Sequence, residues 1–275
     1  MNTIYSTSCL SRRGHSIVSL LVVMACLVVL FVILMTALQG VMGGGEGGRG
    51  RENTVRNHAD RMNLAGIHQG MATFAASNNG RLPVPSEIYP SLNKTADTTA
   101  ALFSLMLSDG YVVAKQLVSD QEQSPFVNYY TGDARGLRGV TMPGQAPNLD
   151  IGFRADLHSE SHVSYAHMPL LGRRLQENWV LGGPSNFPLL GNRGPAQGQP
   201  SPDSYACDPT TGEWAGNVLF ADGHVEFSRS VHLTSRSVGG QADNIFALED
   251  DYTGSDAFLT FVLRIDVNGF EFQHD

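Results

Sequence analysis

The chain has 275 residues, of which 42% are hydrophobic and 16% charged, and its formal net charge is −8. This length suffices for one domain of ordinary size plus a membrane element, or for two small domains. An acidic chain without a basic patch and interleaved aromatics is not expected to bind nucleic acid. Cys207 is the only cysteine after residue 26, so the soluble part cannot form an internal disulfide.

An uncharged apolar segment runs from Ile17 to Leu38, shortly after Arg12 and Arg13. Its 22 residues would form a helix of about 33 Å, enough to cross a hydrocarbon core of about 30 Å. A cleavable signal peptide has a shorter apolar region, about 7–15 residues, and ends in small residues. We therefore predict a transmembrane helix over residues 15–39, with the N-terminus in the cytoplasm because of the two arginines.

The residues before this segment resemble a known processing site. A short basic leader ends in Gly14, and the apolar stretch follows from His15 through Leu20 and Leu21. This resembles type IV prepilins and type II secretion pseudopilins, in which a membrane peptidase cuts after such a glycine and methylates the new N-terminus. The resemblance implies processing between Gly14 and His15 and a following helix that packs against other subunits.

Two positions depart from the family pattern. His15 replaces the usual aromatic residue, and Ser19 replaces the glutamate usual at mature position five. A carboxylate at that depth costs about 2.5–3.5 kcal/mol to insert, and in the family it pairs with the α-amino group of a neighbouring subunit. Ser19 cannot neutralise that amine. Because the large minor pseudopilin at the filament tip also lacks the glutamate, we predict a minor or tip subunit.

The soluble part begins with a glycine-rich stretch and a helix. Residues 40–50 contain seven glycines and predict a flexible joint, since each glycine in a helix costs about 1 kcal/mol against alanine. A helix is predicted from Thr54 to a stop at Asn78-Asn79-Gly80. One face of it carries Leu64, Ile67, Met71 and Phe74. Residues 63–83 also resemble pilin-like proteins that carry a C-terminal H-x9-DG signature.

The middle of the chain predicts short elements. Residues 101–118 predict a helix, a turn at Asp109-Gly110, and then a short apolar strand or second helix. Residues 121–200 are rich in Pro, Gly and Asn, with short apolar runs between. This pattern predicts brief strands joined by long loops.

The segment GNVLFADGHVEF, residues 216–227, predicts a β-hairpin with Asp222-Gly223 at its turn. A two-residue Asp-Gly connection favours a type I′ turn, in which both central residues have positive φ. The segment also resembles the end of the H-x9-DG signature. The histidine of that signature would be residue 212, but this position holds Gly212. No role of that histidine therefore carries over.

The remaining polar clusters give little sign of catalysis, and we predict that the chain is not an enzyme. His224 and Glu226 share one face of a strand, as a half-exposed hairpin requires. His158, His162 and His167 have spacings of 4 and 5, but no carboxylate motif completes a metal site. A G-x-S-x-G motif is absent, and the glycine clusters lack the lysine of a phosphate loop.

The acidic stretch 242–258 holds the candidate ligands for a cation. Asp250, Asp251 and Asp256, with carbonyls of a glycine-containing loop, could supply oxygen ligands for calcium. The resemblance implies the same, because major pseudopilins hold calcium in a C-terminal loop. The alternative is a solvated acidic loop with no metal, and no other cofactor is predicted. The chain then ends in a predicted strand pair that turns at Asn268-Gly269.

These elements predict an α+β fold, with an N-terminal transmembrane helix and then a pilin-like head in which a helix packs on an antiparallel β-sheet with long loops. The predicted parts are a prepilin leader at 1–14, a transmembrane and assembly helix at 15–39, a glycine-rich hinge at 40–52, and an extracytoplasmic head at 53–275.

The predicted function is that of a prepilin-like subunit of a type II secretion or type IV pilus-like filament. It would lie in the bacterial inner membrane with a single span, its N-terminus cytoplasmic and its head periplasmic. Its partners would be the prepilin peptidase and other pilin or pseudopilin subunits, with no nucleic acid. The alternative is a membrane-anchored periplasmic binding module or enzyme whose pilin-like anchor is incidental.

Overall fold

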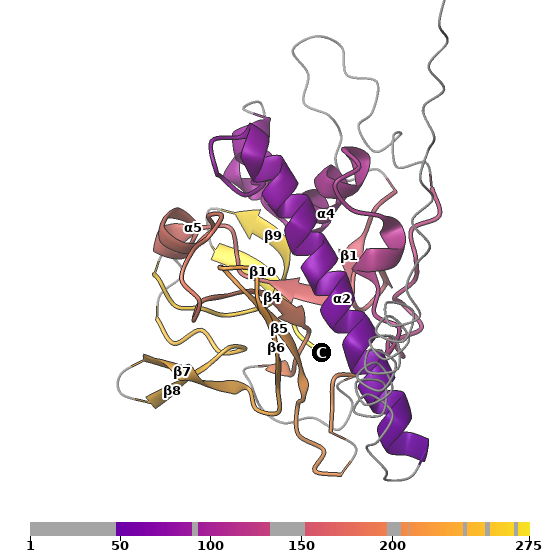
Figure 1. The fold of residues 1–275 in the computed structure, drawn as a ribbon. Helices are drawn as coiled ribbons and strands as arrows, with labels where there is room; N and C mark the ends of the chain where they lie inside the picture. The colour runs from indigo at the N-terminus through magenta and orange to yellow at the C-terminus, as the bar shows by residue number, and fades with distance from the viewer. Residues whose placement is uncertain are drawn as a thin grey trace, which may run out of the picture. The chain divides into compact units, whose positions relative to one another are not determined.

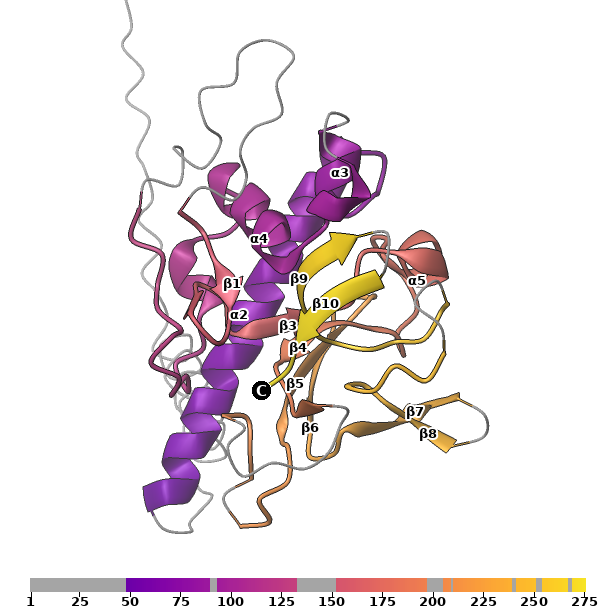
Figure 2. The same ribbon diagram turned by 180° about the vertical axis from the view of Figure 1, so that it is seen from behind.

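A computed structural model of the chain describes residues 48–89, 93–132, 152–196, 205–208, 210–238, 241–250, 254–266 and 269–275. The chain divides into two compact units, Met1–Glu52 and Asn53–Asp275. In the described part of the second unit, one long helix lies along a set of antiparallel strands (Figure 1). Seen from behind, the shorter helices α3 and α4 gather near the C-terminal end of that helix (Figure 2).

The long helix, α2, spans Gly48–Ser77. Its apolar face is the predicted one, because Leu64, Ile67, Met71 and Phe74 are all buried. It begins six residues before the predicted start at Thr54, so the last glycines of the predicted joint are helical. It ends where the sequence indicated: Asn79 and Gly80 have φ of 55° and 77°, and Gly80 N donates to Ala75 O at 2.8 Å.

Two glycines of α2 lie where other segments approach the helix closely. A Cβ at Gly70 would collide with the main-chain oxygen of Tyr111, well inside 3.0 Å. A Cβ at Gly66 would meet only the side-chain amide of Gln116, at 2.5 Å, and that flexible side chain can move. The close approach at Gly70 therefore depends on the missing side chain, whereas the one at Gly66 does not.

We expect Gly70→Ala to lower the free energy of unfolding by about 1–2 kcal/mol, because overpacking against a rigid main chain outweighs the gain of about 1 kcal/mol in helix propensity. Gly66→Ala is the matched control, since it has the same propensity gain and a movable neighbour; it should be neutral or stabilising. Urea denaturation of both variants measures the difference. Equal effects at the two positions would show that the contact with Tyr111 is not tight.

Four short helical segments follow α2. They are α3 (Pro85–Ile88), the 3₁₀ turn η1 (Lys94–Ala96), α4 (Thr99–Ser108) and the 3₁₀ turn η2 (Ala114–Leu117). Thr98 caps α4 by accepting a hydrogen bond from Ala101 N at 3.2 Å. The predicted turn at Asp109-Gly110 is confirmed, with Gly110 at a φ of 76°. After this turn the sequence predicted either a short strand or a second helix, and the structure has the 3₁₀ turn η2 there.

The main sheet has four antiparallel strands in the order β3-β4-β5-β6. Their bounds are Tyr165–His167, Pro188–Asn192, Gly216–Phe220 and Val225–Ser228. Among the described residues, three two-stranded sheets accompany it: β1 (Ala155–Asp156) with β2 (Glu160–Ser161), β7 (His232–Val238) with β8 (Gln241–Asn244), and β9 (Phe261–Asp266) with β10 (Gly269–Gln273). A helix, α5 (Gly172–Asn178), joins β3 to β4. The short strands of residues 121–200 agree with the sequence pattern.

The terminal hairpin β9–β10 adjoins the main sheet. His167 and Thr260 exchange two main-chain hydrogen bonds of 3.1 Å, which connect the start of this hairpin to β3. The predicted strand pair at the end of the chain is confirmed, with Gly269 paired to Asp266; Asn268 of its predicted turn lies outside the described residues.

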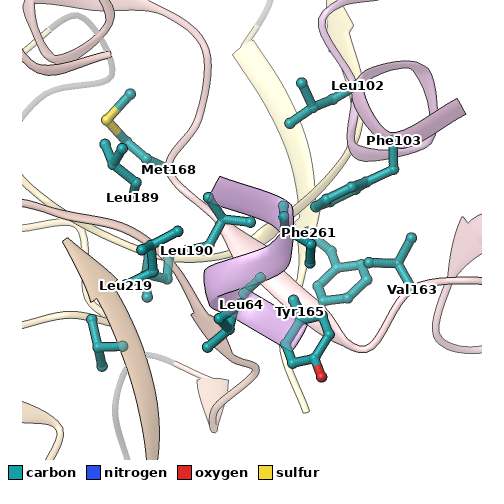
Figure 3. Packing of buried hydrophobic residues seen from close by; sticks show 14 of the residues in the cluster. Leu64, Leu102, Phe103, Val163, Tyr165, Met168, Leu189, Leu190, Leu219 and Phe261 are labelled. Carbon is teal, nitrogen blue, oxygen red and sulfur yellow. The ribbon is translucent and has the colours of Figure 1, made fainter. Parts of the chain in front are cut away.

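The core lies between α2, α4 and the strands. Figure 3 shows Leu64 of α2 beside Leu190 and Leu219 of the main sheet, with Tyr165 close by. Phe103 of α4 and Phe261 of β9 belong to the same cluster. This main cluster therefore holds α2, α4, the main sheet and β9 together, while Ala101 and Leu105 of α4 form a small separate cluster.

β5 and β6 form the predicted hairpin, but with a different turn. Phe220 N donates to His224 O at 3.0 Å, so the loop has three residues, Ala221 to Gly223. Within it only Gly223 has a positive φ, 92°. The predicted two-residue type I′ turn is therefore wrong. Asp222 keeps ordinary backbone angles because its carboxylate accepts from His224 N at 3.1 Å, and the three-residue loop needs only one left-handed residue.

The predicted fold class needs a correction, because it placed a transmembrane helix before the head. No helix among the described residues is long and apolar enough to cross a membrane. α2 has the length, but its first half, GRGRENTVRNHADR, carries charged residues throughout, and these are costly in a bilayer core. The predicted span, residues 15–39, lies outside the described residues. The corrected fold class is α+β with antiparallel sheets.

Candidate functional site

The turn of the β5–β6 hairpin packs against α2. A Cβ at Gly223 would overlap the imidazole ring of His68, so the glycine is needed for this contact as well as for its backbone angle. Burial lowers the pKa of His68, while the nearby charge of Asp222 opposes that shift. The predicted structural residues Asp222 and Gly223 thus lie where the hairpin meets the long helix.

A buried carboxylate, Asp60, links α2 to the main sheet. It is fully buried and accepts hydrogen bonds from Tyr165 Oη at 3.0 Å and from Asn192 Nδ2 at 2.9 Å. Gln121 Nε2 donates to it as well, at 3.0 Å. Tyr165 belongs to β3 and Asn192 to β4, so one carboxylate connects the helix with two strands and with the loop after η2.

The network continues from Asn192 to Tyr205. Asn192 Nδ2 donates to Tyr205 Oη at 2.7 Å, and Tyr205 Oη donates to Ser164 O at 3.1 Å. Burial raises the pKa of Asp60 above its usual value, although its hydrogen-bond donors oppose the shift. Burial and the charge of Asp60 together raise the pKa of Tyr165 and that of Tyr205 well above 10. Both phenols therefore stay protonated and act as donors.

A buried group of three charges lies beside this network. Arg193, 4% exposed, donates to both carboxylate oxygens of Glu122 at 2.5 and 2.8 Å and to Asp275 Oδ1 at 2.6 Å. Its guanidinium also lies 4.6 Å from the ring centre of Tyr205. Burial alone would lower the pKa of Arg193, but the charges of Asp275 and Glu122 hold it above its usual value.

The predicted processing and assembly residues cannot be placed. Gly14, His15, Ser19, Leu20 and Leu21 lie outside the described residues.

The three histidines of the segment 158–167 are held by different partners. His167 is fully buried, with Nε2 2.9 Å from Thr99 Oγ1 and Nδ1 2.7 Å from Met168 O. Burial lowers its pKa to about 4. His162 Nδ1 lies 3.0 Å from Asn128 O, and His158 Nδ1 lies 3.1 Å from Gln273 Nε2. The histidine spacing does not produce a shared metal site among the described residues.

The calcium candidates are only partly brought together. Asp250 forms an ion pair of 3.1 Å with Arg174 and accepts main-chain hydrogen bonds from Ser255 and Asp256. Asp251 lies outside the described residues. Asp256 lies instead with Asp243 and Glu249, carboxylates that the sequence pattern did not single out. Burial raises the pKa of Asp256, helped by the charge of Asp250.

Sequence reasoning missed Asp60, although a signal was present. Asp60 precedes Leu64 by four residues and so continues the spacing of the buried face of α2, where a charged residue needs partners. Glu122, Arg193 and Tyr205 come from loops and strand ends with no periodic pattern, and only the fold brings them together.

The buried polar groups around Asp60 and Arg193 hold separate parts of the fold together. Donors and acceptors of the Asp60 network bind one another and connect α2, β3 and β4 with the loop 119–124, while the Arg193 group holds the same loop to the end of the chain. Comparisons with protein-family models, with curated proteins and with solved structures give no match for this chain.

Proposed function

We propose that this chain is a prepilin-like, or pseudopilin, subunit of a type II secretion or type IV pilus-like filament, at a minor or tip position. A prepilin peptidase removes the leader after Gly14, and the apolar segment that begins at His15 associates with other subunits. The head faces the periplasm and acts as a displayed part of the filament.

One observation carries the proposal: a short basic leader ends in a glycine directly before a long uncharged segment. An ordinary signal peptide places its cleavage site after the apolar region, next to small residues. Here the glycine, Gly14, stands before that region. Ser19, in place of the glutamate of the family pattern, supports a specialised position rather than that of the bulk subunit.

A further point of support comes from the head. The two head segments that carry the family resemblance, residues 63–83 and 216–227, are far apart in the sequence but touch, with His68 of the first against Gly223 of the second. Both segments that carry the resemblance therefore lie in parts of the head that pack against each other. The buried attachment of α2 to the sheet suits a head that is carried by its N-terminal part.

The test is the mass of the mature chain isolated from membranes of a cell that makes prepilin peptidase. We expect a chain that begins at His15, with a methylated α-amino group. Gly14→Val should leave the leader in place, because the peptidase acts after a glycine. Gly40→Val is the matched control, a glycine to valine change beyond the apolar segment, and it should be processed at the same bond.

Two results would count against the proposal, and the first of them would favour the alternative of a membrane-anchored binding module or enzyme. One is a chain that retains Met1 when the peptidase is present. The other is a chain cut beyond Leu38, which would show that the apolar segment is a removed signal. Either result would contradict the proposal.

A further inference from the structure

A small cavity lies beside the buried charges of Arg193, Glu122 and Asp275. Its volume is about 300 Å³, at the lower end of the range for small-molecule sites. Its wall comes from the loop 123–126, from residues 157 and 158, from residues 274 and 275, and from Arg193 and Tyr205. Arg193 bonds both to Glu122, next to that loop, and to Asp275, so two sides of the wall are fixed to each other.

The charged groups of the wall already bind one another. Arg193 donates from Nε to Asp275 Oδ1 at 2.6 Å and from its other two nitrogens to Glu122. The second carboxylate oxygen of Asp275 accepts from Tyr205 N at 3.0 Å. This group holds one positive and two negative charges, so an anion would meet repulsion, and a cation would compete with Arg193 for Asp275. The cavity therefore suits a neutral ligand.

Two imidazoles of the wall have hydrogen-bonding capacity left. The His274 ring has an edge contact with Phe272, with ring centres 6.0 Å apart, and no hydrogen bond to the other described residues. Burial lowers its pKa to about 4, so at neutral pH this ring offers one N–H donor and one nitrogen acceptor. His158 Nδ1 accepts from Gln273 Nε2 at 3.1 Å, which leaves the other ring nitrogen to donate.

The loop 123–126 adds further neutral groups and an aromatic surface. Ser124 Oγ accepts from Phe126 N at 3.3 Å, and its hydroxyl hydrogen remains available. The side-chain amide of Gln123 is exposed and has no hydrogen bond within the described part of the chain. Phe126, 44% exposed, gives the cavity a flat apolar surface. An aromatic ring beside neutral donors and acceptors favours a ligand with an apolar face and several hydroxyl groups.

We infer that this cavity binds a neutral sugar, with one pyranose ring packed on Phe126 and its hydroxyl groups bonded to His274 and the loop 123–126. A hydroxyl both donates and accepts, so it can satisfy an imidazole or an amide in either orientation. The C–H groups on a pyranose face are apolar and pack on an aromatic ring. A ligand of about 12 non-hydrogen atoms should bind here with a Kd on the order of 1 mM. The inference does not depend on the proposed function.

The test is saturation-transfer NMR on the full chain in a phosphocholine detergent, because a glucoside detergent would itself compete. Methyl β-glucopyranoside, methyl β-galactopyranoside and methyl N-acetyl-β-glucosaminide are each titrated to about 20 mM. At least one should bind saturably with a Kd on the order of 1 mM, and the tightest of them identifies the preferred stereochemistry. Glucuronate should bind about tenfold more weakly, because Glu122 and Asp275 repel its carboxylate.

Two variants and a matched control locate the binding. Phe126→Ala should raise the Kd about tenfold, since it removes the aromatic surface. Tyr129→Ala is the control: Tyr129 is 43% exposed but does not line the cavity, so the Kd should not change. His274→Phe keeps the ring shape without the nitrogens and should raise the Kd about three- to tenfold. Its Tm should not fall, because the parent ring has no hydrogen bond to the other described residues.

Saturable binding that weakens in Phe126→Ala and His274→Phe, but not in Tyr129→Ala, would support the inference. Failure of all three sugars to bind saturably would overturn it, as would equal losses in Phe126→Ala and Tyr129→Ala. Tighter binding of glucuronate, or of N-acetylglycinamide, than of the neutral sugars would also overturn it, because the cavity would then select an anion or a peptide amide.

Discussion

Glu122→Gln is expected to lower the free energy of unfolding by about 3–5 kcal/mol, because it leaves the buried guanidinium of Arg193 short of a charged partner. The carboxylate of Glu122 is only 6% exposed and accepts two hydrogen bonds from Arg193, whose third goes to Asp275. It also accepts from Ser164 Oγ at 2.8 Å and from two main-chain N–H groups of its own loop. An amide of the same shape must turn an NH₂ group towards one of these donors.

The exposed pair Arg81–Glu87 provides the matched comparison. Its side chains are 64% and 41% exposed, and its N–O distance is 3.1 Å. Glu87→Gln removes the same charge from the same kind of pair, yet should cost no more than about 1 kcal/mol because water screens it. Urea denaturation of both variants at neutral pH measures the two losses. A loss of under about 1 kcal/mol for Glu122→Gln would mean that the Arg193 group does not hold the loop 119–124 in place.

Asp60→Asn is the second large effect, with an expected loss of about 2–3 kcal/mol at pH 7. The carboxylate receives donors from β3, β4 and the loop after η2, so an NH₂ group at either oxygen position would face a donor. The loss should be larger at lower pH. Because burial raises the pKa of Asp60 in the folded state, the folded protein binds a proton more readily than the unfolded chain does.

This difference between the folded and unfolded pKa of Asp60 sets the direction in which its contribution to stability changes with pH. The proton-linked contribution of Asp60 is fully present below the unfolded pKa of 3.8 and is lost as pH rises through the raised folded pKa. Other groups titrate in both proteins and cancel in the comparison. Urea denaturation of the parent and of Asp60→Asn from pH 3.5 to 7 should therefore show a stability gap that narrows as pH rises. A gap that widens over this range would mean that the pKa of Asp60 is lowered in the fold.

Local patterns predicted much of the head. The spacing of Leu64, Ile67, Met71 and Phe74 indicated the buried face of α2, and Asn79-Gly80 indicated its end, because both signals depend on nearby residues alone. The hairpin at 216–227 was predicted for the same reason. Its turn was wrong because Asp-Gly is compatible with more than one loop length, and the hydrogen bond from His224 N to Asp222 decides between them.

The buried polar groups could not be predicted in the same way. Arg193, Glu122 and Asp275 are separated by 71 and 82 positions, and nothing in their neighbouring residues marks them as partners. The acidic loop shows the same limit. Proximity in the sequence suggested Asp250 with Asp251, but the ion pair with Arg174 occupies Asp250, and the fold brings Asp243 to Asp256 instead.

The most direct measurement for the proposed role is the intact mass of the mature chain, recovered from native membranes without added protease. A mass that corresponds to residues 15–275 with one added methyl group is the predicted result. A mass that corresponds to the whole 275-residue chain, from cells with an active prepilin peptidase, would contradict it.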